Sequence, residues 1–164
     1  MGIRTFTFEE FLTVLNQIEG ILNSRPISPM SSDPGDLMAL TPAHFIIGRS
    51  IKALPEGELT EIPENRLSHF QKLQSIIQNF WKRWSKEYLS ELQTRTKWKK
   101  NSRTLLKLGS MVMIKNEGLP STRWQLGRVV ALHPGADGVV RVVDTKTTKG
   151  LLRRSVNKLC VLPI

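Results

Sequence analysis

The side chains best suited to catalysis are few and far apart in this chain of 164 residues. The histidines are His44, His69 and His133, and the single cysteine is Cys160. No serine stands in the G-x-S-x-G spacing of a hydrolase nucleophile, and the cysteine has no histidine near it in sequence. Three histidines and one cysteine also give no zinc-finger spacing and no internal disulfide. The sequence therefore gives no support for a catalytic triad or a structural zinc site.

Two aspartates, Asp33 and Asp36, lie three residues apart in the loop 24–40, which is rich in serine, proline and glycine. Two carboxylates at this spacing could share a metal ion. Aspartates in such loops more often cap turns by accepting nearby backbone N–H groups. The sequence also lacks a glycine-rich loop of the P-loop or dinucleotide-binding kind. We therefore expect turn caps at these positions, and neither a metal ion nor a cofactor.

The positive charge of the chain is concentrated in its second half. The formal net charge is +10, yet residues 1–80 carry six basic and nine acidic side chains, whereas residues 81–164 carry 18 basic and five acidic ones. A lysine or arginine that contacts a phosphate releases counterions, so such an excess is typical of proteins that hold a polyanion. The alternative is a basic surface that serves only solubility. The asymmetry favours nucleic acid as the partner.

The basic side chains lie at the end of a predicted long helix and in the strands after it. Strand alternation places Arg141 opposite to Val140 and Val142, so Arg141 faces solvent if the valines face the core. After residue 120 only Asp137 and Asp144 are acidic. The alternative is that the cations are ordinary outward charges. The candidate nucleic-acid-binding residues are Lys97, Lys99, Lys100, Arg103, Lys115, Arg123, Arg128, Arg141, Arg153, Arg154 and Lys158.

Aromatic side chains are scarce in this basic half, and Trp124 is the only one after Trp98. A methyl-lysine cage or a base-stacking sheet needs several aromatic residues. We expect Trp124 to anchor a core rather than to read a base. Binding would then depend on phosphates, with little sequence discrimination and a strong dependence on salt.

Three helices are predicted to precede the strands. A helix over 7–23 begins with a capping box of Thr7 and Glu10 and has a wide apolar stripe. A short helix follows Thr41 and ends at Gly48. A connector over 49–64 leads to a long helix from about residue 65 to 95, where apolar residues recur every three or four positions.

The last third of the chain changes to the pattern of short strands. β-Branched runs lie at 111–115, 125–132, 139–144, 151–154 and 156–162, and turn signals separate them. Five short strands at this spacing predict a small antiparallel barrel, closed so that no edge is exposed. The predicted fold class is α+β, with helices followed by a five-stranded antiparallel barrel.

Membrane and export signals are missing from the sequence. No apolar run approaches the roughly 18 residues of a membrane helix, and the first residues lack the apolar stretch of a signal peptide. We expect a protein that has no membrane partner and is not secreted.

Several blocks in fixed order resemble a known family. The blocks are Asn23-Ser24-Arg25-Pro26, Leu40-Thr41-Pro42-Ala43-His44-Phe45-Ile46-Ile47-Gly48, Phe80-Trp81-Lys82-Arg83-Trp84 with Glu87-Tyr88-Leu89, Leu119-Pro120, Trp124-Gln125-Leu126-Gly127-Arg128-Val129-Val130, His133 to Val143, Arg154, and Lys158 to Pro163. Together they resemble the C-terminal end of the integrase region of BEL/Pao-type retroelement polyproteins. The resemblance covers nearly the whole chain.

The resemblance implies a division into three parts. Residues 1–50 would be the last helices of a ribonuclease-H-like integrase core, 51–105 an acidic connector and the long helix with its basic end, and 106–164 an SH3-like barrel that contacts DNA. The catalytic carboxylates of the family lie upstream of the matched segment, so Glu9, Glu10 and Glu19 inherit no catalytic role. The wide apolar stripe of the first helix would then lack its natural partner, the core sheet.

Two functions follow from these expectations. The first is a noncatalytic retroelement-derived fragment that binds DNA through phosphate contacts of the basic helix end and the barrel. The alternative is a protein interaction or self-assembly module, as a homo-oligomer or with a polyprotein core. The family and the basic stretch 95–107 suggest the nucleus, with the cytoplasm as the other possibility.

Overall fold

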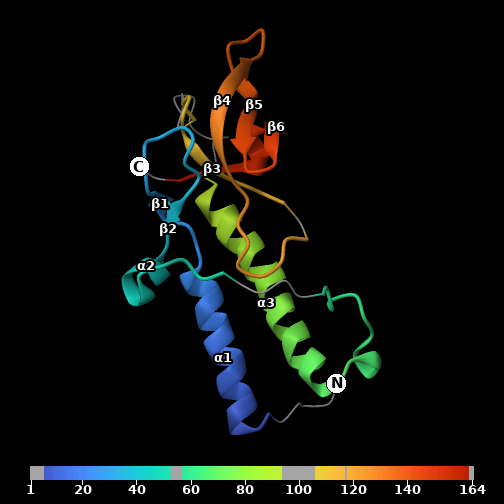
Figure 1. Cartoon of the computed structure of the whole chain (residues 1–164). Coiled ribbons are helices and arrows are strands. Elements are labelled where there is room, and N and C mark those ends of the chain that lie inside the picture. Colours follow the sequence, from blue (N-terminus) through green and yellow to red (C-terminus); the bar gives the residue numbers. More distant parts are fainter. Residues whose placement is uncertain (1–5, 53–56, 94–105, 117, 163–164) are drawn as a thin grey trace.

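The computed structural model describes residues 6–52, 57–93, 106–116 and 118–162, and within them the fold is α+β. Figure 1 shows two long helices side by side, with the larger sheet at one end of the pair. The helices are α1 (Phe8–Asn23), α2 (Pro42–Ile47) and α3 (His69–Leu92). The strands are β1 (Ser28–Pro29), β2 (Ala39–Leu40), β3 (Met111–Ile114), β4 (Leu126–Pro134), β5 (Val140–Thr147), β6 (Gly150–Ser155) and β7 (Leu159–Val161).

Helix α1 begins with the capping box that the sequence predicts. The Glu10 N–H donates to Thr7 Oγ1 at 3.3 Å, and the Thr7 N–H donates to Glu10 Oε2 at 3.0 Å. These bonds satisfy two of the backbone donors that a helix leaves free at its start. Val14 and Ile21 are the buried residues of α1, and they pack with Ile77 of α3.

Helix α3 starts later than the expected residue 65. Ser68 is the N-cap, and its hydroxyl and the Gln71 side chain form a second capping box. The spacing Ser68-x-x-Gln71 is the capping-box signature, which the prediction overlooked. The preceding residues Glu64–Arg66 form a separate 3₁₀ turn, η1. Leu67 between them is buried in an extended conformation, which prevents one continuous helix.

The five predicted strands all form, but they do not close into a barrel. They make one antiparallel sheet in the order β6-β5-β4-β3-β7, so β6 and β7 are its two edges. The chain passes from β6 to β7 through the 3₁₀ turn η3 (Val156–Lys158), although 156–162 was expected to be strand throughout. β7 has only 3 residues and pairs with β3. Closing the barrel would require β6 to pair with β7, and β7 is too short to offer β6 many backbone hydrogen bonds. The predicted closure is therefore wrong.

Strand β3 is buried on both faces and so shows no polar alternation. Val112 and Ile114 pack with Val143 in the interior of the curved sheet. Met111 and Met113 pack on the opposite face with Leu89 of α3. A strand with two covered faces is expected to be continuously apolar.

Trp124 joins the sheet to the helix pair. Its ring meets Trp81 edge-on at a centroid distance of 4.8 Å, and lies 5.8 Å from Trp84 and 5.6 Å from Tyr88. Its indole N–H donates to Ser24 Oγ at 3.2 Å, just beyond α1. As expected, Trp124 is a core anchor rather than an exposed aromatic side chain.

None of the helices in the described ranges has the length and apolar character that crossing a membrane requires.

Candidate nucleic-acid interface

The hairpin of β4 and β5 carries one ion pair at its tip. Arg141 donates to both oxygens of Asp137, at 2.9 Å and 2.5 Å. The Arg141 guanidinium, followed by the Val139 N–H, lowers the pKa of Asp137 to about 2. Arg141 is exposed, as strand alternation predicts, but a neighbouring carboxylate already occupies its bidentate side. A phosphate would have to compete with Asp137 for that fork.

A second acidic residue, Asp144, accepts hydrogen bonds from side chains of the two neighbouring strands. Arg153 of β6 donates to its two oxygens at 2.6 Å and 3.0 Å, and His133 Nε2 lies 2.8 Å from Oδ2. Arg153, and after it His133, holds the pKa of Asp144 well below its usual range. Cross-strand pairing explains the arrangement, because Arg153 lies directly opposite Asp144.

Arg128 has a different environment from the other predicted cations. It is 4% exposed, and its guanidinium donates to three backbone carbonyls. The acceptors are Asp36 O at 2.8 Å, Gly109 O at 3.0 Å and Ser31 O at 2.5 Å. In this position Arg128 joins the loop of the β1–β2 hairpin to the sheet, and its guanidinium is not available to a phosphate.

Lys115 and Lys158 lie where the sheet meets the end of α3. The Lys115 N–H donates to Lys158 O at 2.8 Å. Lys115 Nζ donates to Gln93 Oε1 at 2.7 Å, and Gln93 Nε2 donates to Asn157 O at 2.6 Å. Gln93 is the C-cap of α3. These bonds place both lysines beside the point where the chain enters its basic stretch.

Residues 94–105, which hold most of that basic stretch, are outside the described residues. Lys97, Lys99, Lys100 and Arg103 all belong to it, so the structure gives no position for these four predicted contacts. In sequence, residues 94–105 carry five basic side chains and no acidic one.

The basic side chains that remain available to a phosphate are those that are exposed and have no acidic partner in the described ranges. Among the predicted residues these are Arg123, Arg154 and Lys158. Within residues 106–162, three further exposed lysines of this kind were not among the predicted contacts: Lys107, Lys146 and Lys149. The outward orientation of Lys146 could have been predicted from strand alternation, because Lys146 lies between the inward Thr145 and Thr147 on β5.

The structure brings together only some of the predicted residues. Arg154 is opposite Val143, whereas Arg153 and Lys146 belong to the other face of the β5–β6 pair. Arg123 is an exposed residue of the loop that precedes β4. The end of the edge strand β6 and η3 carry Arg153, Arg154 and Lys158, and Lys115 is hydrogen-bonded to Lys158 through the backbone. We call these four residues the β6–η3 surface; it includes both faces of the edge strand, because Arg153 and Arg154 point to opposite sides.

The aspartates considered as metal ligands and the single cysteine form hydrogen bonds with nearby backbone groups. Asp33 Oδ1 accepts the Gly35 N–H at 2.7 Å and Asp36 Oδ1 accepts the Met38 N–H at 2.8 Å, which are turn caps. Within the described ranges no three His, Cys, Asp or Glu side chains gather as metal ligands would. Cys160 Sγ lies 3.1 Å from Leu89 O, and burial raises the pKa of its thiol to about 11. This cysteine is therefore not a reactive thiolate.

The C-terminal part of the chain matches a protein-family model. A family model described as "Family of unknown function (DUF5641)" matches residues 68–162, which is more than half of the chain. No curated protein matches the chain, and no solved structure does.

Proposed function

Since the chain belongs to the family of unknown function DUF5641, we propose its function from the placement of its charges. We propose that it binds nucleic acid, with DNA as the natural ligand, without performing catalysis. The contacts are made to phosphates by the β6–η3 surface together with the basic stretch 94–105. Arg153 contributes at the edge of this surface, where it shares its guanidinium with Asp144.

The observation that favours this proposal is the uneven neutralisation of the sheet's charge. Residues 106–162 contain ten basic and three acidic side chains. Asp137 and Asp144 are both paired, with Arg141 and Arg153. Arg154 and Lys158 have no acidic partner among the described residues, and Lys158 lies beside the C-cap of α3, after which the basic stretch follows in sequence. A polyanion gains most from cations that no carboxylate already neutralises.

The expected recognition is independent of sequence. Base stacking needs exposed aromatic side chains, but Trp124 lies in the core, against Trp81 and Tyr88. Phosphate contacts position a protein on nucleic acid without reading bases. The affinity should therefore fall steeply as salt rises and change little with base composition.

The family resemblance supports the same proposal. In the BEL/Pao integrase region, an SH3-like domain after a connector helix contacts DNA. The order of α3 and then a five-stranded antiparallel sheet agrees with that arrangement at a coarse level. We propose residues 1–50 as a remnant of the integrase core, 51–105 as the connector and 106–164 as the SH3-like part. Such a fragment would act in the nucleus or the cytoplasm.

Fluorescence anisotropy with a labelled DNA duplex, measured across a range of salt concentrations, tests the proposal. The slope of log K against log salt should be steep, and Arg154→Ala/Lys158→Ala should reduce it by about 0.9 for each phosphate that is no longer bound. The matched control is Arg66→Ala/Lys72→Ala, which removes the same charge around the start of α3, at the end of that helix away from the sheet (Figure 1). Affinity that does not depend on salt, or an equal reduction in the control, would contradict the proposal.

A second candidate function, protein interaction, is favoured by the exposed apolar face of α1. Successive helical residues are about 100° apart, so Phe8, Leu12 and Leu15 fall within about 60° of one another and roughly 130° from Val14 and Ile21. Phe8 is 75% exposed, and Leu12 and Leu15 are 45% and 44% exposed. A helix with two apolar faces buries both when its partner is present.

Alanine at Arg141, Arg153 and Arg154 separates the two functions. DNA binding should fall in this variant, while the mass measured by sedimentation stays the same. A change of mass with DNA binding intact would assign these arginines to assembly.

A further inference from the structure

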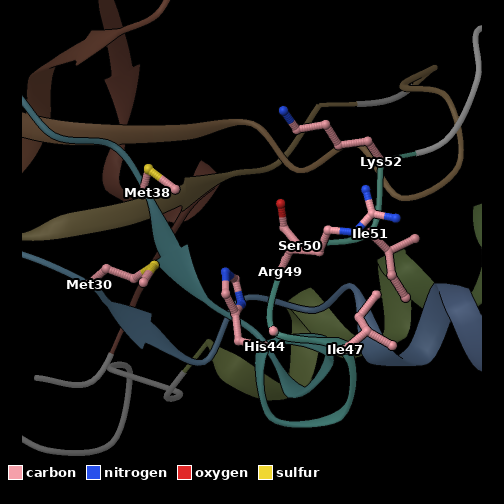
Figure 2. Close-up of a pocket in the computed structure, with 9 residues that line it drawn as sticks. Met30, Met38, His44, Ile47, Arg49, Ser50, Ile51 and Lys52 are labelled. Atoms are coloured by element: carbon pink, nitrogen blue, oxygen red, sulfur yellow. The ribbon is translucent and has the colours of Figure 1, made fainter.

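A surface groove lies beside α2, outside the β6–η3 surface. It runs between the β1–β2 hairpin and the segment that follows α2, and has a cavity volume of about 630 Å³. Figure 2 shows Met30 and Met38 on the hairpin side and Ile47 and Ile51 on the other side. The volume is in the range of binding clefts for small ligands and short peptide segments.

The apolar walls of the groove are unusually exposed for their side-chain type. Met30 is 49%, Met38 58% and Ile47 52% exposed. Methionine is flexible and polarizable, so it adapts its shape to an apolar ligand. Facing apolar walls of this kind fit a bulky aliphatic or aromatic side chain inserted between them.

The groove also offers a hydrogen-bond donor, the ring of His44. The Thr41 N–H donates to His44 Nδ1 at 3.0 Å. Because Nδ1 accepts this bond, the ring hydrogen lies on Nε2, which has no protein partner in the described ranges. Figure 2 shows the His44 ring at the middle of the groove. His44 therefore offers one N–H donor to a ligand.

Two cations lie at the same groove, Arg49 and Lys52. Neither side chain has an ion pair or hydrogen bond in the part of the chain that the structure describes, and the described lining contains no acidic residue. Cations beside an apolar cleft, with no carboxylate to neutralise them, complement an anionic ligand that has an apolar body.

Hydrogen bonds support the backbone on both sides of the groove. Arg128 fastens Ser31 and Asp36 of the hairpin to the sheet. On the other side, Gly48 ends α2 with a φ of 73°, and its N–H donates to His44 O at 3.1 Å. Only glycine adopts that conformation without strain, and it directs the chain toward Arg49.

We propose that this groove binds a short acidic segment of another protein that carries aliphatic side chains. The aliphatic groups would enter between the methionines and isoleucines, and the carboxylates would pair with Arg49, Lys52 and the Nε2–H of His44. Charge complementarity selects an acidic ligand, and the apolar walls distinguish it from a bare polyanion. The described lining has no aromatic residue on which a base could stack. This inference is independent of the proposed nucleic-acid binding.

Anisotropy with a short fluorescein-labelled peptide of alternating Glu and Leu tests the groove. The full chain should bind this peptide at least about tenfold more tightly than a matched peptide with Ser in place of Leu. Arg49→Ala/Lys52→Ala, and separately Met38→Asp, should each weaken binding about tenfold. Arg66→Ala/Lys72→Ala, which removes the same charge elsewhere, should leave the affinity unchanged, and unfolding midpoints show whether each variant is folded.

Three results would overturn this inference. The first is no binding of the Glu–Leu peptide, and the second is equal binding of the Ser peptide, which would show only nonspecific attraction to the positive chain. The third is a loss of DNA affinity in Arg49→Ala/Lys52→Ala with peptide binding intact, which would assign these cations to nucleic acid. DNA titration of the same variants keeps failure of this inference distinct from failure of the proposed function.

Discussion

The α1–α2 region and the sheet contain similar apolar residues but bury them very differently. In the sheet, Val112 and Val143 are 0% exposed, whereas Phe8 of α1 and Phe45 of α2 are each 75% exposed. The sheet folds its own hairpins over these valines, so the burying partner is close in sequence. Helix α1 has α3 on one face only. The difference teaches that the inner face of the sheet is buried by the sheet's own strands. By contrast, α1 and α2 leave large apolar side chains exposed.

The two regions also differ in charge. The α1 segment contains three acidic side chains and no basic one, whereas residues 106–162 have ten basic and three acidic side chains. The sheet region therefore presents charge to a polyanion, and the helical region presents apolar surface to a protein. One chain thus has two kinds of surface, each fitted to a different class of partner.

The largest expected difference in the free energy of unfolding is between substitutions on the two apolar faces of α1. Ile21 is 2% exposed against α3, and Ile21→Ala should lower the free energy of unfolding by about 3 kcal/mol, because it leaves a cavity. Leu12→Ala should change the free energy by less than about 0.5 kcal/mol. Urea unfolding measures both. Equal losses would mean that the exposed face is already covered in solution.

Arg128→Ala tests whether the hairpin and the sheet are joined by this one side chain. Three carbonyls lose their donor, which should cost about 2 kcal/mol in the free energy of unfolding. Arg128→Lys should recover only part of the loss, because a single ammonium does not reproduce the planar fork of the guanidinium. The comparison variant is Arg154→Ala on the exposed strand β6, for which an unchanged urea midpoint is expected. A similar loss at both positions would contradict the special role of Arg128.

The smallest expected effect concerns the ion pair of Asp137 and Arg141 at the exposed hairpin tip. The pKa of Asp137 is lowered from 3.8 to about 2 in the folded protein. The stabilisation of the folded state by this ion pair is therefore complete above pH 3.8 and is lost as the pH falls through about 2. Asp137→Asn should flatten the pH dependence of the unfolding midpoint in that interval.

Arg141→Gln supplies the matched partner of this change. It should flatten the acid profile in the same way, and the double variant should add nothing further. A wild-type profile retained in either single variant would show that the pair is not formed in solution.

Much of the secondary structure was predictable because it depends on neighbours in sequence. Thr7 with Glu10, and Gly48 after α2, mark helix ends through local hydrogen bonds and backbone conformation. The five strands were equally visible as β-branched runs between turns. The start of α3 was misplaced because the apolar period continues through Leu67, while the Ser68 capping box begins the helix after it.

The sheet's closure and the roles of its arginines were not predictable from sequence. Alternation places a residue on a face, but it does not show what covers that face. Arg128 and Arg141 therefore looked alike as strand cations. The first is buried beneath the β1–β2 hairpin, which comes from about 90 residues earlier in the chain, and the second is paired at an exposed turn.

The sequence by itself determined the helices, the strands and the charge division of this protein, because these features depend on local backbone preferences and on simple counts of ionisable groups. Only the tertiary structure decided which cations remain available, which apolar face of α1 is covered and where the groove beside α2 forms. Those properties depend on contacts between segments that are distant in the chain, and such contacts arise from packing rather than from any local pattern.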